Sequence, residues 1–130
     1  MHTCLNLVCS PEGTASAVLL RAGEIVVGAP LALTRRGEVP LRDLARGPAR
    51  LAKALGVVLS ESGDPMDRAF ELLPADRPVV VASSVRTGVS GAGGGVEYPW
   101  RFHVAGDPTV SPYRRAVPRR RPSPGAQPAR

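Results

Sequence analysis

The stretch Gly47-Pro48-Ala49-Arg50-Leu51-Ala52-Lys53-Ala54-Leu55-Gly56 carries the clearest structural signal in the sequence. Proline favours the first turn of a helix, because its missing N–H group would have no intrahelical partner there. Leu51 and Leu55 lie four residues apart and therefore on one helix face, whereas Arg50 and Lys53 project from other faces. The closing glycine is typical of a helix end. The pattern predicts a short helix that starts at the proline.

Short apolar segments on both sides of this helix are typical of strands. Residues 4–9 and 15–21 flank the turn Ser10-Pro11-Glu12-Gly13 and predict a hairpin with a loop of about four residues. Further strands are expected at residues 25–27, at the continuous apolar run 79–82, which is typical of a buried strand, and at residues 100–104. Residues 31–33 fit a second short helix. Strands with one or two short helices and no regular βαβ order predict an α+β fold, which we expect as a single small domain with a curved, mainly antiparallel β-sheet.

Length and composition limit the protein further. The chain has 130 residues, which is enough for one small domain, and its 43% hydrophobic content includes only 4% aromatic residues. Its apolar runs are far shorter than the roughly 20 residues that span a bilayer, and the chain does not open on a secretory signal pattern. We therefore expect a cytoplasmic protein that makes no membrane contact.

The positive charge is concentrated at the C-terminus. The net charge is +6, yet residues 1–111 carry as many basic as acidic side chains. The excess comes from six arginines in residues 112–130, a segment that contains no acid, many prolines and little apolar surface. Such a segment cannot bury enough surface to fold. The sequence thus predicts a domain over residues 1–111 and a disordered tail over residues 112–130, which either contacts phosphates or has no selected role.

The two cysteines and two histidines give no metal signal. Cys4, Cys9, His2 and His103 lack the two close ligand pairs that are typical of a structural zinc site. We expect two buried free thiols and no metal.

Two segments could contact an anion. Gly88 to Gly95 contains five glycines, but neither a Walker loop nor a dinucleotide fingerprint, so by itself it predicts a flexible loop. Arg86 precedes it and is a candidate phosphate contact. The second segment is the start of the predicted helix, with Arg46, Arg50 and Lys53 around it. On spacing alone, an ordinary solvated helix face explains the latter charges better.

Taken in order, four blocks of the sequence resemble the alkyladenine (3-methyladenine) DNA glycosylase family. The blocks are Met1-His2-Thr3-Cys4-Leu5-Asn6, Ala17 to Ala22, Gly47 to Gly56, and Arg86-Thr87-Gly88-Val89-Ser90-Gly91-Ala92-Gly93 continuing into residues 99–111. The resemblance implies a base-excision repair enzyme of mixed α/β architecture. Such an enzyme flips an alkylated or deaminated purine out of double-stranded DNA, and a glutamate activates the water that attacks the sugar C1′. It implies no cofactor, a monomer, and a bacterial cytoplasmic protein at the nucleoid.

The resemblance also assigns roles to individual residues. It implies that Asn6 discriminates against the exocyclic amine of guanine and that Arg21 orients the attacking water. Arg21 is the candidate catalytic residue, and a guanidinium suits this task because it stays charged and offers several fixed donors. Ser90 and Gly91 match the base pocket. The candidate DNA contacts are Met1, His2, Arg50, Lys53, Arg86 and Gly88.

The sequence departs from the family at the general base. In the family, the catalytic glutamate, the residues that stack on the flipped base and the intercalating tyrosine lie upstream of the position of Met1. Glu12 and Glu24 are not in the context expected of the missing acid. Three interpretations follow: a glycosylase whose working form is longer, a truncated and inactive copy, or a DNA-binding module without catalysis. A small domain unrelated to DNA would require all four blocks to match by coincidence.

Overall fold

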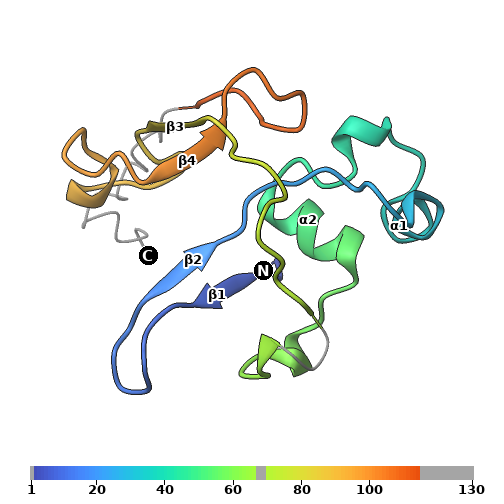
Figure 1. Ribbon diagram of the computed structural model, residues 1–130, viewed down its shortest axis with the longest axis horizontal. Helices are drawn as coiled ribbons and strands as arrows, with labels where there is room; N and C mark the ends of the chain where they lie inside the picture. The colour runs from blue at the N-terminus through green and yellow to red at the C-terminus, as the bar shows by residue number, and fades with distance from the viewer. Residues whose placement is uncertain (1, 67–69, 115–130) are drawn as a thin grey trace, which may run out of the picture. The chain divides into compact units, whose positions relative to one another are not determined.

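The computed structural model describes residues 2–66 and 70–114 and has the mixed α+β composition that the sequence predicts (Figure 1). The chain divides into two compact units: the described parts of residues 1–81 with 104–111, and the described parts of residues 82–103 with 112–130. The strands are divided between two two-stranded sheets. In chain order the elements are β1 (Asn6–Val8), β2 (Ala17–Leu19), α1 (Ala29–Arg36), η1 (Leu41–Asp43), α2 (Pro48–Leu55), η2 (Leu59–Glu61), β3 (Val81–Ser84), η3 (Ala92–Gly94) and β4 (Arg101–Val104).

The predicted N-terminal hairpin is confirmed. β1 pairs with β2 in antiparallel register, with Asn6 opposite Leu19 (Figure 1). Backbone hydrogen bonds continue the pairing on both sides, from Cys9 N to Ser16 O at 3.1 Å and from Leu20 N to Leu5 O at 3.0 Å. The connection is longer than the predicted four residues, because the tight turn at Pro11–Thr14 lies inside a wider loop.

The helix predicted at residues 48–55 is α2, with the expected bounds. Gly56 ends it in the left-handed conformation at φ 78°, and its N–H group returns to the carbonyl of Lys53. This conformation favours glycine because it has no Cβ. The helix expected around residues 31–33 is α1, which starts with Pro30 in its first turn and ends at Arg36.

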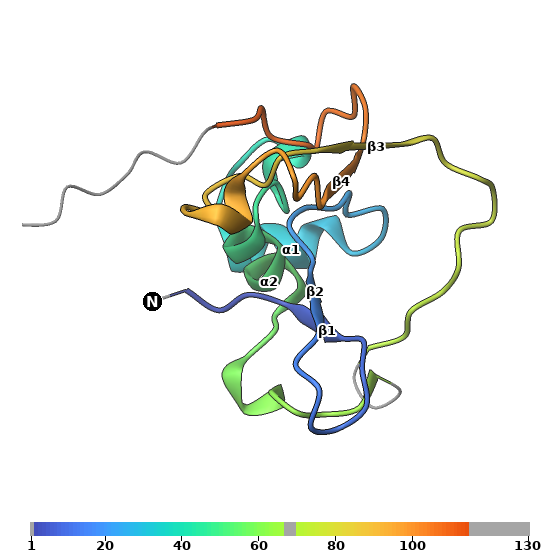
Figure 2. The ribbon, with the colours of Figure 1, turned by 90° about the vertical axis from the view of Figure 1, so that its left-hand side faces the viewer.

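The core of the first unit is small and rich in alanine. It is formed where α1 and α2 pack together with the segment after η1 (Figure 2). Among the described residues, Leu44 is the largest side chain that is completely buried, at 1% exposure. The other buried members of this core cluster are Ala32, Ala45, Leu51 and Ala54. The alternation of buried Leu51 with exposed Arg50 and Lys53 on α2 follows the pattern read from the sequence.

Arginine side chains tie this unit together. Arg35 Nη1 donates to the carbonyl of Ala54 at 2.9 Å, at the last turn of α2, where carbonyls have no intrahelical partner. Arg36 Nε donates to the Leu44 carbonyl at 2.8 Å. Arg46 pairs with Asp43 at 3.3 Å and donates to the Val110 carbonyl at 3.1 Å. These guanidinium groups therefore link segments of the first unit to one another through hydrogen bonds.

Three apolar segments differ from the prediction in their secondary structure or their burial. Residues 25–27 form no strand, and Val27 is 86% exposed. The run 79–82 contributes to β3, but it is not buried, because Val80 is 87% exposed. In β4 the predicted alternation is present, yet Phe102 is 69% exposed while its polar neighbours are half-buried. Apolar composition predicted extended chain, but burial depends on partners that the run itself does not specify.

The remaining structural expectations concern the cysteines, the membrane and the tail. The expected burial of both thiols is wrong for Cys9, which is exposed just beyond β1 at the wide end of the hairpin loop, whereas Cys4 is half-buried. Within residues 2–66 and 70–114, no helix is long and apolar enough to cross a membrane. The tail predicted over residues 112–130 lies outside the described residues from residue 115 onward.

The turn after β4 contains an acid-sensitive contact. Asp107 Oδ1 accepts hydrogen bonds from the Thr109 hydroxyl at 2.6 Å and from the Thr109 N–H at 2.8 Å. These bonds, the hydroxyl first, favour the carboxylate and hold the pKa of Asp107 below its usual value. A lowered pKa contributes stability above the unfolded-state pKa of about 3.9, and this contribution is lost as the pH falls through the lower folded-state value.

We therefore expect the melting temperature of the parent to exceed that of Asp107→Asn at neutral pH. The difference should persist to about pH 5 and shrink below about pH 4, because only the parent carboxylate can then be protonated. Thermal melts of both proteins from pH 7 to pH 3 measure it. A difference that is unchanged at pH 3 would show that the charge of Asp107 has no part in the contact.

Candidate nucleic-acid interface

Asn6 and Arg21 lie at the same end of the hairpin. Asn6 is the first residue of β1 and is exposed opposite Leu19. The pairing continues through Leu20 and Leu5, so Arg21 follows directly after the last paired residue and is also exposed. The hairpin therefore brings an amide and a guanidinium, distant in sequence, to one edge. Among the described residues, no carboxylate forms an ion pair with Arg21.

The N-terminal residues precede this edge. His2 is exposed, and its carbonyl is 3.9 Å from the Cys4 sulfur. The position predicted for Met1 lies outside the described residues. No group of three or more metal-ligating side chains lies together in the described ranges.

The basic side chains around α2 divide into two kinds. Arg50 and Lys53 are exposed on the helix, away from the buried face that contains Leu51. The first turn of α2 contains no acidic residue. Arg46, which the sequence placed with them, instead pairs with Asp43 and the Val110 carbonyl. Arg50 and Lys53 thus remain as the solvent-facing cations at this helix.

The glycine-rich segment belongs to the second unit and forms a turn that is held by backbone hydrogen bonds. The N–H of Gly94 donates to the Gly91 carbonyl at 3.0 Å, and the N–H of Gly95 donates to the Ala92 carbonyl at 2.9 Å. A Cβ at Gly94 would collide with the Val89 carbonyl, so this close approach requires glycine. The sequence alone predicts a flexible loop here. The hydrogen bonds that order the turn join backbone atoms, so the residue types do not reveal them.

The predicted pocket and contact residues of this segment differ in their environments. Gly88, Ser90 and Gly91 are exposed. Arg86 is half-buried, and its Nε donates to the Gly93 carbonyl at 2.9 Å. Its guanidinium carbon lies 5.6 Å from the centre of the Trp100 ring. The structure therefore brings Arg86 into contact with its own turn, a partnership that sequence analysis missed.

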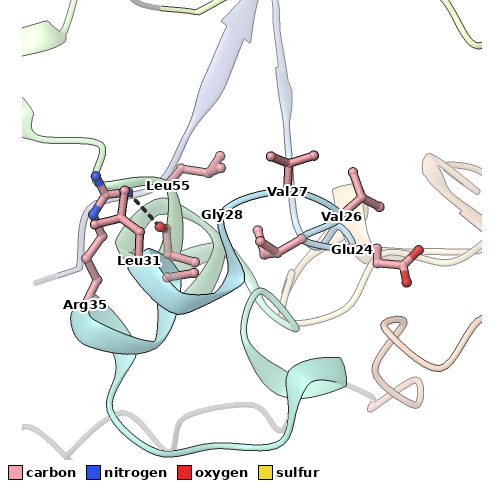
Figure 3. A pocket seen from close by; sticks show the side chains of 10 residues that line it. Glu24, Val26, Val27, Gly28, Leu31, Arg35 and Leu55 are labelled. Carbon is pink, nitrogen blue, oxygen red and sulfur yellow. Dashed lines mark hydrogen bonds between the residues drawn. The ribbon is translucent and has the colours of Figure 1, made fainter.

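Sequence analysis also missed an open groove of about 300 Å³ in the first unit (Figure 3). It is lined by residues 24–28, by Leu31, Ala32 and Arg35 of α1, and by Ala54 and Leu55 of α2. Figure 3 shows the Arg35 guanidinium at one end, where it holds the Ala54 carbonyl, and the Glu24 carboxylate at the other. The apolar run at residues 25–27 was the available signal, but it was interpreted as a strand.

The fold and the candidate site define a small α+β protein that presents an amide, several cations and a glycine-rich turn to solvent. Residues 1–108 match the methylpurine-DNA glycosylase family. The chain belongs to this family, which confirms the resemblance found in the sequence.

Its relatives are longer bacterial proteins. One from Leifsonia xyli subsp. xyli, named "Putative 3-methyladenine DNA glycosylase", is 53% identical over 88% of this chain and 57% of its own length. Relatives with the same name from Streptomyces avermitilis and Mycobacterium tuberculosis are 53% and 42% identical, over 93% and 97% of this chain and 59% and 61% of their own lengths. The chain therefore spans about three fifths of the length of these relatives.

Proposed function

We propose that this chain belongs to a DNA-3-methyladenine glycosylase of base-excision repair, which flips alkylated purines out of DNA and hydrolyses their N-glycosidic bond. The family match over residues 1–108 carries the proposal, because every predicted site residue lies inside the matched range. The substrate would be double-stranded DNA that contains an alkylated or deaminated purine. The protein would act as a monomer without a cofactor, at the nucleoid of a bacterial cytoplasm.

The proposed chemistry starts with base flipping. Extruding a damaged purine costs less than extruding a correctly paired one, and a pocket then tests the extruded base. Asn6 would approach the purine edge and disfavour the exocyclic amine of guanine, while Ser90 and Gly91 would form another part of the pocket. Arg21 would orient the water that attacks C1′. The exposure of Asn6 and Arg21 at one end of the hairpin supports this division of tasks.

DNA binding would depend on the exposed cations. Arg50 and Lys53 on α2 would contact phosphates, with Met1, His2 and Gly88 near the DNA backbone. Each neutralised phosphate releases counterions. The logarithm of the binding constant should therefore fall with the logarithm of the salt concentration, with a slope of roughly 0.9 per contact. This sequence-independent attraction would place the chain on DNA, and the base pocket would provide the preference for damage.

A second candidate function is DNA binding without catalysis. The observation that favours it is the exposure of the cations Arg50 and Lys53 on α2, which can bind phosphates without any hydrolytic step. The two candidates share the phosphate contacts. A binding module without catalysis should bind damaged and undamaged duplexes alike, with a steep salt dependence, whereas a glycosylase pocket should prefer the damaged duplex.

Asn6→Ser tests the base-reading role. Hypoxanthine is guanine without its exocyclic amine, so two duplexes with either base opposite cytosine differ by one amino group. We expect the substitution to reduce the preference for hypoxanthine roughly tenfold, because the interaction of the amide with the purine edge is lost. Fluorescence anisotropy with both duplexes measures the ratio of dissociation constants.

Thr14→Ser, an equally small change in the exposed loop of the same hairpin, is the matched control and should keep the parental ratio. Comparing ratios within each protein removes the difference in pairing strength between the two duplexes. An unchanged ratio in Asn6→Ser would refute the role of Asn6.

A further inference from the structure

Arg86 has two partners, and both belong to its own unit. Its Nε and Nη2 both donate to the single carbonyl oxygen of Gly93, with Nε at 2.9 Å. Its guanidinium lies over the Trp100 ring at 5.6 Å, within the range of a cation–π contact. Trp100 in turn meets Tyr98 edge-on, with ring centres 4.9 Å apart and planes at 73°. The guanidinium is thus held between a backbone carbonyl and an aromatic pair.

These two contacts of Arg86, with the Gly93 carbonyl and with the Trp100 ring, are called the Arg86 grip, and the first of them lies in the glycine-rich turn at residues 88–95. Gly93 lies in η3, directly after the exposed residues Ser90 and Gly91. A Cβ at Gly93 would lie 2.6 Å from Arg86 Nη2, so the guanidinium would have to move away from the backbone if another residue stood at that position. Hydrogen bonds from a charged donor are stronger than neutral ones. Arg86 therefore adds a charged side-chain contact to a turn that otherwise has the backbone hydrogen bonds from Gly94 to Gly91 and from Gly95 to Ala92.

We infer that Arg86 is a positioning residue that shapes the turn carrying Ser90 and Gly91, and that it affects purine recognition through this turn and not as a phosphate contact. The inference rests on the proposed function for its effect on recognition, whereas the grip itself is independent of DNA. A phosphate contact needs chiefly the positive charge. The grip needs the planar fork and the flat face of a guanidinium, which lysine does not have.

Arg86→Lys and Arg86→Gln, made in the complete 130-residue chain, separate the two roles. We expect both substitutions to accelerate hydrogen exchange of the amides of residues 88–95 roughly ten- to a hundredfold, as for the loss of a charged hydrogen bond. The amides of α2 serve as the internal reference for an intact fold. Trp100→Leu removes the other side of the grip and should loosen the same amides.

The fluorescence of Trp100 gives a second, direct signal, because the sequence contains one tryptophan. Its emission should change in Arg86→Lys and in Arg86→Gln, since both remove the guanidinium from the ring. Arg77→Gln, which removes one exposed charge elsewhere, is the matched control and should leave emission and exchange unchanged.

Binding to the hypoxanthine and guanine duplexes completes the test. We expect the preference for hypoxanthine to fall in both Arg86 variants and lysine not to restore it. Normal exchange, normal emission and full preference in Arg86→Lys would overturn the inference and identify Arg86 as a charge contact. If the parent itself shows no preference, the proposed function fails, while exchange and emission still decide whether Arg86 holds the turn.

Discussion

Leu44→Ala should lower the free energy of unfolding by about 2–5 kcal/mol. Leu44 is 1% exposed and is the largest completely buried side chain among the described residues. Besides Leu51, the other buried members of its core cluster are alanines, which are too short to fill the cavity that the truncation leaves. Small domains have total stabilities of only about 5–15 kcal/mol, so a loss of this size removes a large share.

Leu41→Ala is the matched control, because Leu41 lies in the neighbouring η1 turn and is 64% exposed. The same truncation there should change stability by less than about 0.5 kcal/mol. Urea unfolding followed by far-ultraviolet circular dichroism reports on α1 and α2, where this core lies. Equal losses in the two variants would contradict the assignment of the core.

The second large effect concerns hydrolysis. We expect the 130-residue chain to release 3-methyladenine from DNA about 10²–10⁴-fold more slowly than the longer Leifsonia xyli relative that is named for this activity, since a general base contributes a factor of this order. Among the described residues, no carboxylate pairs with Arg21, and both Glu12 and Glu24 are exposed. Single-turnover assays with saturating protein measure the chemical step without interference from product release.

Glu12→Gln and Glu24→Gln serve as controls within the chain. Neither should change the residual rate, because neither carboxylate is expected to activate water. A rate comparable with that of the relative, abolished by one of these substitutions, would place the general base in this chain and make it a complete catalyst.

Local sequence signals predicted the elements that depend on local geometry. Pro48 and Gly56 mark the ends of α2, and the turn at Pro11 marks the hairpin, because capping and turn preferences act over a few residues. The exposure of Val80 could not be predicted in the same way, since burial is decided by distant parts of the fold.

In the candidate site, too, some features follow from the local sequence and others depend on distant parts of the fold. Asn6, Arg50 and Lys53 are exposed, and the roles that the family resemblance assigns to them stay predictions. The partners of Arg86 could not be foreseen, because one is a backbone carbonyl, which leaves no trace in the residue type, and the other is an aromatic ring beyond the glycine-rich turn. Such contacts depend on the path of the chain between them.

The most direct test of the central claim is the affinity of the complete chain for the hypoxanthine and guanine duplexes, measured by anisotropy over a series of salt concentrations. We predict tighter binding to hypoxanthine at every concentration, with both affinities falling as salt rises, because phosphate contacts are shared and the base pocket is not. Equal affinities at every salt concentration would contradict the account and reduce the chain to a nonspecific binder of polyanions.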